Sequence, residues 1–241
     1  MRFTMILLLL AFFSASNAIA RNQSISSFSK AKKILQRQVY NDHRTTIYCG
    51  ANFDTHKNVE PLLGFFTNKY KKRAKRIEWE HVVPAENFGR TFKEWRDGDP
   101  QCVSSKGKSF KGRNCARKAN TEFRFMEADL FNLYPAIGAV NASRSNYNFV
   151  MLPDSQSSFG SCDMRIESRK AQPPESARGR IARTYLYMDH SYPRYSMSKQ
   201  QQKLMTAWNK MYPVSEWECT RAARIKDIQG GGNPFVSVHC Q

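Results

Sequence analysis

Six cysteines follow an apolar N-terminal segment, and together these features limit how the chain can fold. An even number of cysteines in an exported protein predicts three disulfides. Proximity along the chain favours Cys102–Cys115 and Cys219–Cys240, which leaves Cys49–Cys162, although other pairings remain open. A zinc site is the weaker alternative, because no two of these cysteines are closer than 13 residues. Cysteine pairs in zinc sites are typically about two to four residues apart.

The first 20 residues have the pattern of a cleavable signal peptide. Arg2 supplies a positive charge, residues 5–13 are apolar, and Ala18-Ile19-Ala20 has the small residues of a cleavage site. Nine apolar residues are too few to span a bilayer, which takes about 20, and no later stretch is more apolar. We therefore expect a periplasmic or secreted protein without a membrane segment, whose mature chain covers residues 21–241.

Positive charge is the second unusual property of the sequence. The chain has 38 lysines and arginines against 20 aspartates and glutamates, a formal net charge of +18, and removal of Arg2 leaves 18 − 1 = +17. Because 41% of the residues are hydrophobic, the chain can form a core, which excludes a disordered basic tail. The charge indicates an acidic partner, such as nucleic acid, an anionic membrane or an acidic polysaccharide, rather than a surface that is basic only for solubility.

The pattern of apolar residues predicts a mixed α+β fold, a single helix-rich domain. A helix is expected over residues 27–39. Alternation of Ile77, Trp79 and His81 with charged residues predicts a half-buried strand, which Pro84 ends.

The middle of the chain is expected to contain a long loop and an interrupted helix. Residues 86–120 have few large apolar side chains, so they should form a loop closed by a disulfide. From Glu122 the chain becomes helical, and Pro135 predicts either two helices or one kinked helix. Residues 45–48 and 147–152 are candidates for short strands.

The last third of the chain is expected to be helical. Two apolar stripes at helical spacing predict faces buried in the core rather than cofactor contacts. Ser198 and Gln201 have the spacing of a capping box at the start of the second helix, and Pro213 should end that helix. The stripes consist of Ala177, Ile181, Tyr185 and Met188 in the first helix, and of Leu204, Trp208 and Met211 in the second.

The pair Glu80-His81 is the best candidate for catalytic residues. Hydrolysis of a phosphodiester needs a base for the attacking water and a cation beside the phosphate. A neutral imidazole can be the base, and Mg²⁺ held by one or two oxygen ligands can be the cation. A lone histidine on a strand is more often structural, but the adjacent carboxylate and the preceding run of lysines and arginines favour catalysis. Adjacent residues point to opposite faces of a strand, so both can serve one site only where the strand ends.

Six sequence motifs resemble those of the periplasmic endonuclease I family. They keep the order found in the family and are spread over most of residues 77–241. In this chain they are Trp79–Pro84 (WEHVVP), Met126–Leu133 (MEADLFNL), Pro135–Asn141 (PAIGAVN), Arg144–Phe149 (RSNYNF), Arg178–Met188 (RGRIARTYLYM) and Glu216–Arg221 (EWECTR).

The resemblance implies a non-specific endonuclease for DNA and RNA with a central ββα-metal motif. Matched residue by residue, Glu80 and Asn141 resemble ligands of Mg²⁺, or of another divalent ion such as Mn²⁺ or Ca²⁺. His81 resembles the general base, and Glu127 resembles a further acidic residue of the active site. The products would carry 5′-phosphates, and the protein would be a monomer.

The active-site arginine of the family lies in a loop before a cysteine. Arg113 is the best candidate here and Arg117 is the alternative, because residues 86–120 match the family only loosely.

The separation of Glu127 and Asn141 limits how they can act together. Fourteen residues (141 − 127) along one straight helix span about 21 Å, too far for two groups at one metal site. They can approach each other only if the chain turns around Pro135. Otherwise Glu127 would be an ordinary acidic residue of a first helical turn.

Basic residues are expected to contact the phosphates of the nucleic acid. Such contacts give affinity without reading the sequence, and they weaken steeply with salt. The expected phosphate-contacting residues are Lys69, Lys71, Lys72, Arg73, Arg76, Arg144, Arg178 and Arg180, with further basic residues at Lys106, Lys108, Lys111, Lys118 and Arg183.

Two functions are compatible with this charge. One is an exported, Mg²⁺-dependent endonuclease. The alternative is a non-catalytic exported protein that binds DNA or another polyanion, but such a protein has no need of Glu80, His81 and Asn141 together.

Overall fold

The computed structural model of the chain describes residues 21–240, and the predicted signal peptide lies outside this range. The fold is α+β, as predicted, with many short helices and two small sheets. Up to the middle of the chain the elements are α1 (Phe28–Ile34), the π-helical turn η1 (Leu35–Val39), the 3-10 turn η2 (Arg73–Lys75), β1 (Ile77–His81), α2 (Ala85–Gly89), α3 (Lys93–Arg96), α4 (Arg113–Ala119), α5 (Thr121–Glu127) and the 3-10 turn η3 (Leu130–Asn132).

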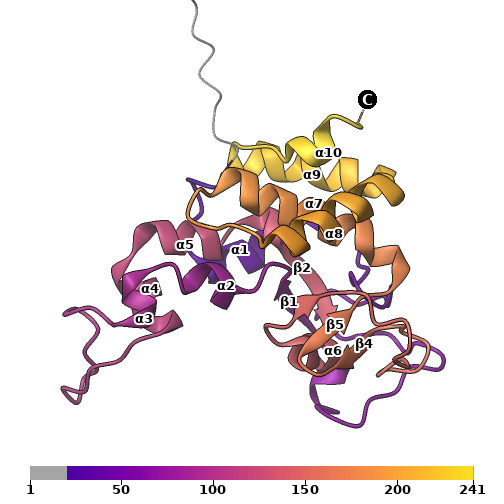
Figure 1. Ribbon diagram of the computed structural model, residues 1–241, viewed down its shortest axis with the longest axis horizontal. Helices are drawn as coiled ribbons and strands as arrows, with labels where there is room; N and C mark the ends of the chain where they lie inside the picture. Colours follow the sequence, from indigo (N-terminus) through magenta and orange to yellow (C-terminus); the bar gives the residue numbers. More distant parts are fainter. Residues whose placement is uncertain (1–20, 241) are drawn as a thin grey trace, which may run out of the picture.

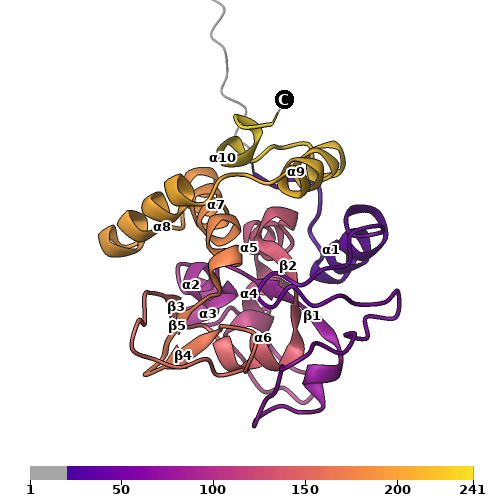
Figure 2. The same ribbon diagram turned by 90° about the vertical axis from the view of Figure 1, so that its right-hand side faces the viewer.

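The rest of the described chain consists of β2 (Leu133–Ile137), α6 (Gly138–Arg144), β3 (Asn148–Phe149), β4 (Arg165–Glu167), β5 (Lys170–Gln172), α7 (Glu175–Ser191), α8 (Lys199–Met211), α9 (Glu216–Gln229) and α10 (Pro234–Ser237). Figures 1 and 2 show β1 and β2 near the centre of the molecule. The C-terminal helices α7, α9 and α10 lie above these strands, and α6 and the β3–β5–β4 sheet lie towards the opposite side. Within residues 21–240, none of the helices has the length and apolar character needed to cross a membrane.

Strands β1 and β2 pair antiparallel, with Ile77 opposite Ile137. The prediction that Pro135 interrupts helical structure is wrong, because Pro135 lies in the middle of β2. Its carbonyl oxygen accepts a hydrogen bond from the Ile47 N–H at 2.8 Å. The two backbone polar groups of a strand residue point to the same side, so the N–H that Pro135 lacks would face away from β1. The β1–β2 ladder therefore loses no hydrogen bond.

Strand β1 is more deeply buried than the predicted half-buried strand. Ile77, Trp79 and His81 lie in the core as expected, but Glu80 is also buried, with 3% of its surface exposed. A carboxylate can be buried in this way only where it has polar partners, and these are described with the active site below.

Residues 86–120 do not form one long loop, because α2, α3 and α4 interrupt the segment. Phe88 and Phe92 are buried, and both rings contact the ring of Phe123 in α5. These two aromatic residues anchor the start of the segment in the core. Only the part between α3 and α4 is a loop, and Cys102–Cys115 closes it.

The other short elements agree only in part with expectation. The helix predicted for residues 27–39 is present as α1 followed by η1. The strand predicted for residues 147–152 is reduced to β3, which pairs parallel with β5. Residues 45–48 contain only an isolated bridge, between Thr45 and Asn52.

Helix α6 begins at a close contact between backbones. A Cβ atom on Gly138 would lie 2.6 Å from the carbonyl oxygen of Arg73 and 2.9 Å from the Glu78 carboxylate. The Gly138 N–H also donates to the Arg76 carbonyl oxygen at 2.9 Å. Glycine therefore allows α6 to start directly against the basic segment that leads into β1.

The apolar stripe predicted for α7 is buried, but the face of α8 differs from prediction. Met205 and Trp208 are the buried residues of α8, whereas Met211, its last residue, is 65% exposed. Ser198 caps α8 by accepting from the Gln201 N–H. The Gln201 side chain donates to the Phe149 carbonyl oxygen instead of completing a capping box.

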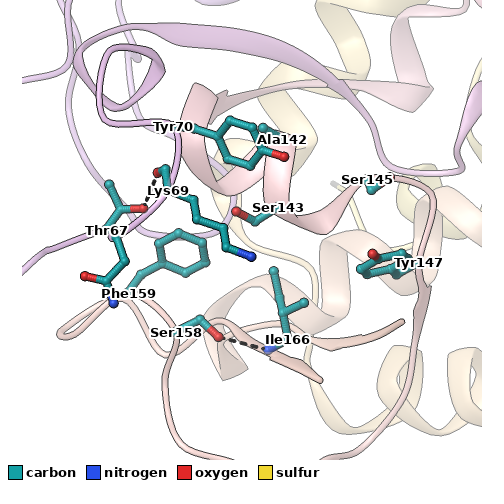
Figure 3. A pocket seen from close by; sticks show the side chains of 11 residues that line it. Thr67, Lys69, Tyr70, Ala142, Ser143, Ser145, Tyr147, Ser158, Phe159 and Ile166 are labelled. Atoms are coloured by element: carbon teal, nitrogen blue, oxygen red, sulfur yellow. Dashed lines mark hydrogen bonds between the residues drawn. The ribbon is translucent and has the colours of Figure 1, made fainter. Parts of the chain in front are cut away.

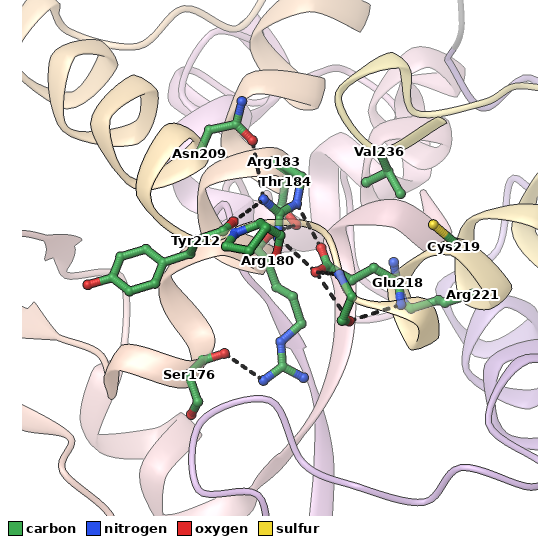
Figure 4. Close-up of polar contacts among 12 residues, drawn as sticks. Ser176, Arg180, Arg183, Thr184, Asn209, Tyr212, Glu218, Cys219, Arg221 and Val236 are labelled. Carbon is green, nitrogen blue, oxygen red and sulfur yellow. Dashed lines mark hydrogen bonds and ion pairs between the residues drawn. The ribbon is translucent and has the colours of Figure 1, made fainter. Parts of the chain in front are cut away.

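A buried ion pair joins α7 to α9. Arg183 is 2% exposed, and its Nε and Nη2 donate to the two carboxylate oxygens of Glu218 at 2.8 and 2.7 Å (Figure 4). Glu218 also forms the complete capping box of α9 with Ser215. Arg183 is therefore a structural residue, although its position in the sequence suggests a phosphate contact.

Three disulfides are present, with the predicted pairing. Cys102–Cys115 and Cys219–Cys240 are the two pairs favoured by proximity along the chain, and Cys49–Cys162 is the pair that remained. Within residues 21–240 no cysteine is free, so the zinc alternative is wrong.

We expect Glu218→Gln to lower the free energy of unfolding by about 3–5 kcal/mol, because it leaves the buried Arg183 charge without its counter-ion. Urea unfolding with the disulfides intact measures this loss. Glu216→Gln is the matched control, since Glu216 is an exposed acidic residue in the same first turn of α9. It should change stability by no more than about 0.5 kcal/mol. Equal losses in the two variants would contradict a dominant role for the ion pair.

Candidate active site

A cavity of about 320 Å³ lies where β1 ends, and four predicted active-site residues line it. Glu80 and His81 come from the end of β1, Arg113 from the start of α4, and Asn141 from α6. Because β1 ends at His81, two adjacent side chains both reach the cavity. The other lining residues are Phe28, Trp79, Pro84, Ala85, Glu86, Trp95, Ser145 and Asn146.

His81 is held in the orientation of a neutral base. Its Nε2 lies 2.9 Å from the backbone carbonyl oxygen of Glu127. A carbonyl oxygen only accepts, so Nε2 carries the proton and Nδ1 carries the lone pair. Burial, followed by the positive charge of Arg113, lowers the pKa of His81 to about 3, so the imidazole is uncharged at neutral pH. Within residues 21–240 no group bonds to Nδ1, which is therefore available to accept a proton.

Glu80 is fixed through one of its two carboxylate oxygens. Oε1 accepts from the Tyr48 hydroxyl at 2.8 Å and from Arg144 Nη1 at 2.7 Å. Burial raises the pKa of the Glu80 carboxyl, and the Arg144 charge counteracts this effect. Oε2 accepts no hydrogen bond from the described part of the chain, which leaves one oxygen for a ligand.

The predicted phosphate contact of Arg144 is wrong. We expected it to contact phosphate, but its side chain is fully buried, so a phosphate in solution cannot reach it. Besides Glu80, it donates to the backbone carbonyl oxygens of His81 at 2.9 Å and of Val82 at 2.6 Å. Arg144 thus fixes the end of β1, where Glu80 and His81 lie.

Asn141 is oriented by a second carboxylate of β1. Its Nδ2 donates to Glu78 Oε2 at 2.8 Å, and Glu78 in turn pairs with Arg73 at 2.5 Å. No residue in the described range bonds to Asn141 Oδ1. The amide therefore offers its carbonyl oxygen, the atom that can bind a metal ion.

The Glu127 carboxylate lies outside the cavity lining and binds two arginines. Oε1 accepts from Arg113 Nε and Arg117 Nη2, each at 2.5 Å, and Oε2 accepts from Arg117 Nε at 2.7 Å. Burial alone would raise the pKa of Glu127, but these arginines lower it overall. The chain does turn between Glu127 and Asn141, through η3 and β2, yet the two residues do not meet at one site.

Glu127 binds Arg113 only through Nε, so neither terminal nitrogen of this guanidinium has a hydrogen-bond partner within residues 21–240, and of the two Nη2 is buried. Arg113 lines the cavity, whereas Arg117 does not. The geometry therefore favours Arg113 over Arg117 as the group that contacts phosphate.

The donor set at the cavity fits a hard divalent cation. Glu80 Oε2 and Asn141 Oδ1 are both oxygens, and both lack partners in the described chain. Mg²⁺ prefers oxygen ligands and usually keeps several waters, so one or two protein ligands are typical of its sites. The described residues contain no cluster of three or more His, Cys, Asp or Glu side chains able to hold a metal ion.

The predicted basic groups lie at different places on the fold. The five residues of the first group, Lys69, Lys71, Lys72, Arg73 and Arg76, are exposed just before β1.

Arg178 and Arg180, by contrast, are half-buried on α7 and do not line the cavity. Arg178 donates to the Tyr212 hydroxyl at 2.9 Å. Arg180 donates to the Ser176 carbonyl oxygen at 3.0 Å (Figure 4).

Several residues that shape the site carry no signal in the sequence. Tyr48 is far from Glu80 in the chain, and nothing in its neighbourhood predicts the hydrogen bond between them. Phe28 packs on the His81 ring, with the centroids 4.8 Å apart. Glu86 accepts from the Asn146 side chain at 2.7 Å across the cavity wall. Of these residues, only Asn146 lies in one of the six family motifs, Arg144–Phe149.

Comparisons with known proteins show the family of the chain. The Endonuclease I family profile matches residues 18–240. An extracellular deoxyribonuclease of Aeromonas hydrophila is 39% identical over 232 residues, which cover 93% of this chain and 94% of the relative. A periplasmic deoxyribonuclease of the same species is 39% identical over 91% of this chain and 89% of the relative. Endonuclease-1 of Buchnera aphidicola subsp. Acyrthosiphon pisum is 37% identical over 95% and 88%, respectively. With a family match over nearly its whole length, the chain belongs to the endonuclease I family.

Proposed function

We propose that the protein is an exported, Mg²⁺-dependent endonuclease that hydrolyses phosphodiester bonds in DNA and RNA. One observation carries this proposal. A single cavity combines the free lone pair of a neutral histidine, two unpartnered oxygens from Glu80 and Asn141, and an unpartnered guanidinium nitrogen of Arg113. A protein that only binds polyanions has no need of this combination.

In the proposed reaction His81 acts as the general base. Its Nδ1 accepts a proton from the water that attacks phosphorus, while the Glu127 carbonyl oxygen holds the Nε2–H. The Arg113 guanidinium, which lines the cavity, binds an oxygen of the phosphate through a terminal nitrogen, and this anion offsets the Arg113 charge that, together with burial, lowers the pKa of His81.

The elements β1, β2 and α6 are the proposed ββα-metal motif, with Glu80 and Asn141 as the protein ligands of Mg²⁺. When bound there, the ion would stabilise negative charge on the departing 3′ oxygen, and cleavage of that bond would leave a 5′-phosphate on the product. Mn²⁺ or Ca²⁺ could occupy the same oxygen ligands.

Substrate binding is proposed to depend on phosphate contacts. The exposed residues before β1 carry positive charge next to the catalytic strand, and such contacts do not read the base sequence. The relatives named deoxyribonucleases favour DNA as a substrate, and phosphate contacts admit RNA as well. We propose that the protein acts as a monomer.

The protein is proposed to act in the periplasm or outside the cell. Its relatives carry both descriptions, and three disulfides fit an oxidising compartment.

Removal of the metal ion should abolish cleavage without abolishing binding. We expect the mature protein to convert supercoiled plasmid to nicked and linear forms in Mg²⁺, with no conversion in EDTA, because the leaving oxygen then lacks its cation. Gel electrophoresis measures cleavage, and a filter-binding assay in EDTA measures binding. Tight binding with intact plasmid under both conditions would favour the non-catalytic polyanion binder.

We expect His81→Ala to reduce the cleavage rate by about 100-fold to 10,000-fold, because the water loses its base. DNA binding should remain, since His81 is neutral and contacts no phosphate in the proposed mechanism. His56→Ala is the matched control, because this histidine is exposed and does not line the cavity. Cleavage by His81→Ala at the rate of the unmodified protein would rule out His81 as the base.

Loss of Cys102–Cys115 should lower activity, because Cys115 lies in the same short helix as Arg113. We expect the double variant Cys102→Ser/Cys115→Ser to lose about 10-fold to 100-fold in rate, since displacement of a catalytic group by about 1 Å costs roughly that much. The control is Cys219→Ser/Cys240→Ser, which removes the disulfide of α9 instead. Assays are made well below the unfolding temperature of both variants. Equal activity of the two double variants would show that Cys102–Cys115 has no special importance for catalysis.

A further inference from the structure

A second cavity, of about 470 Å³, adjoins the candidate active site and is not used in the proposed reaction. Its size lies within the range of about 300–1,000 Å³ that is typical of small-molecule sites. Ser145 lines both cavities. Helix α6 also borders both, with Asn141 at the first cavity and Ala142 and Ser143 at the second. Consecutive helical residues point about 100° apart, so one helix can serve two neighbouring sites.

The second cavity combines aromatic rings, hydroxyl groups and one cation. None of its eleven lining residues is acidic. Figure 3 shows the Lys69 side chain extending into the space between Phe159 and Ser143, with the Tyr147 ring on the far side. Within residues 21–240, no hydrogen bond or ion pair engages the Lys69 ammonium or the hydroxyls of Ser143 and Tyr147. These groups are therefore available to a ligand.

Two loops that form one wall of this cavity are fixed to each other. Ser161 N–H donates to the Gly64 carbonyl oxygen at 3.0 Å, and a Cβ atom on Gly160 would lie 2.1 Å from that same oxygen. Cys49–Cys162 ties one of these loops to the segment that carries Tyr48. The cavity is thus held in shape without a ligand.

Backbone strain gives an independent indication of a ligand site. Ser145 and Tyr70 have φ values of +54° and +57°, in the region that favours glycine, and both line this cavity. Ser145 is held there because Arg144 before it is buried and the Tyr147 N–H donates to the Arg144 carbonyl oxygen. Unfavourable backbone conformations of this kind cluster at sites that bind ligands.

We propose that this cavity binds the base of the nucleotide on one side of the scissile phosphate, in single-stranded substrates. The proposal rests on the proposed nuclease function. Aromatic rings stack on any base, the hydroxyls can bind base edges or sugar, and Lys69 can pair with the adjoining phosphate. A base in a duplex is already stacked and paired, so the cavity favours single strands.

An oligonucleotide with one abasic position tests this subsite. In Mg²⁺, cleavage at the two phosphates that flank the abasic nucleotide is compared by gel electrophoresis. We expect cleavage at one flank to be about tenfold weaker than at the other, since stacking of one base contributes roughly that much. Tyr147→Ala should slow cleavage of the intact strand about tenfold and remove the difference between the flanks. Tyr147→Phe keeps the ring and should keep the difference.

A matched pair of lysine variants separates the cavity from general charge. Lys69→Ala and Lys71→Ala each remove one positive charge, but only Lys69 lines this cavity. Lys69→Ala should reduce the difference in cleavage between the two phosphates that flank the abasic nucleotide. Lys71→Ala should leave this difference unchanged. Equal cleavage at both flanks by the unmodified protein would overturn the proposal, as would a difference that persists in Tyr147→Ala with an unchanged circular dichroism spectrum.

A binding measurement separates this subsite from the nuclease activity. In EDTA, 2-aminopurine placed next to the preferred phosphate should lose fluorescence on binding the unmodified protein, and lose less with Tyr147→Ala. An oligonucleotide that stays uncut in Mg²⁺ yet shows this quenching in EDTA would contradict the nuclease function and support the subsite. Cleavage without any such quenching would retain the nuclease function and overturn the subsite.

Discussion

The buried ion pair of Arg144 with Glu80 is the interaction on which the active site depends. Arg144 is fully buried and Glu80 is 3% exposed, and either charge alone would be strongly unfavourable there, so the pair is stable only with its hydrogen bonds complete. Arg144 ends α6, bonds to two carbonyl oxygens at the end of β1, and lies 4.4 Å from the centre of the Phe149 ring. One side chain therefore fixes α6, β1 and β3 relative to one another. Because it uses only Oε1 of Glu80, it leaves the other oxygen for a metal ion.

Glu127 organises the opposite side of the cavity through two different groups. Its backbone carbonyl oxygen sets the tautomer of His81, and its carboxylate fixes Arg113 through Nε. The proposed base and the proposed phosphate-binding group are thus held by the same residue at the end of α5. The carboxylate accepts from Nε of Arg113 and from Nε and Nη2 of Arg117, which leaves the two terminal nitrogens of Arg113 without a partner in the described chain.

The sequence predicts which residues meet at the cavity better than it predicts the elements that carry them. Glu80 and His81 stand out because a carboxylate and an imidazole adjoin on a β-patterned segment, and a local pattern is enough to show that. Pro135 was misplaced because its role in β2 depends on Ile47, which is distant in the chain. The role of Arg144 was missed for the same kind of reason. A formal charge does not reveal whether an arginine pairs with a buried glutamate or faces solvent, and only the packing of α6 against β1 decides this.

The two segments that meet at the active site also determine the path available to a substrate. The chain from Lys69 to His81 supplies a lysine of the second cavity at one end and the catalytic base at the other. Helix α6 and the residues after it likewise supply Asn141 to one cavity and Ser143 and Tyr147 to the next. Gly138 allows these two segments to approach closely, through backbone contacts with Arg73 and Arg76. Binding and chemistry therefore share one rigid framework, so a strand seated in the second cavity is held in a fixed position relative to His81.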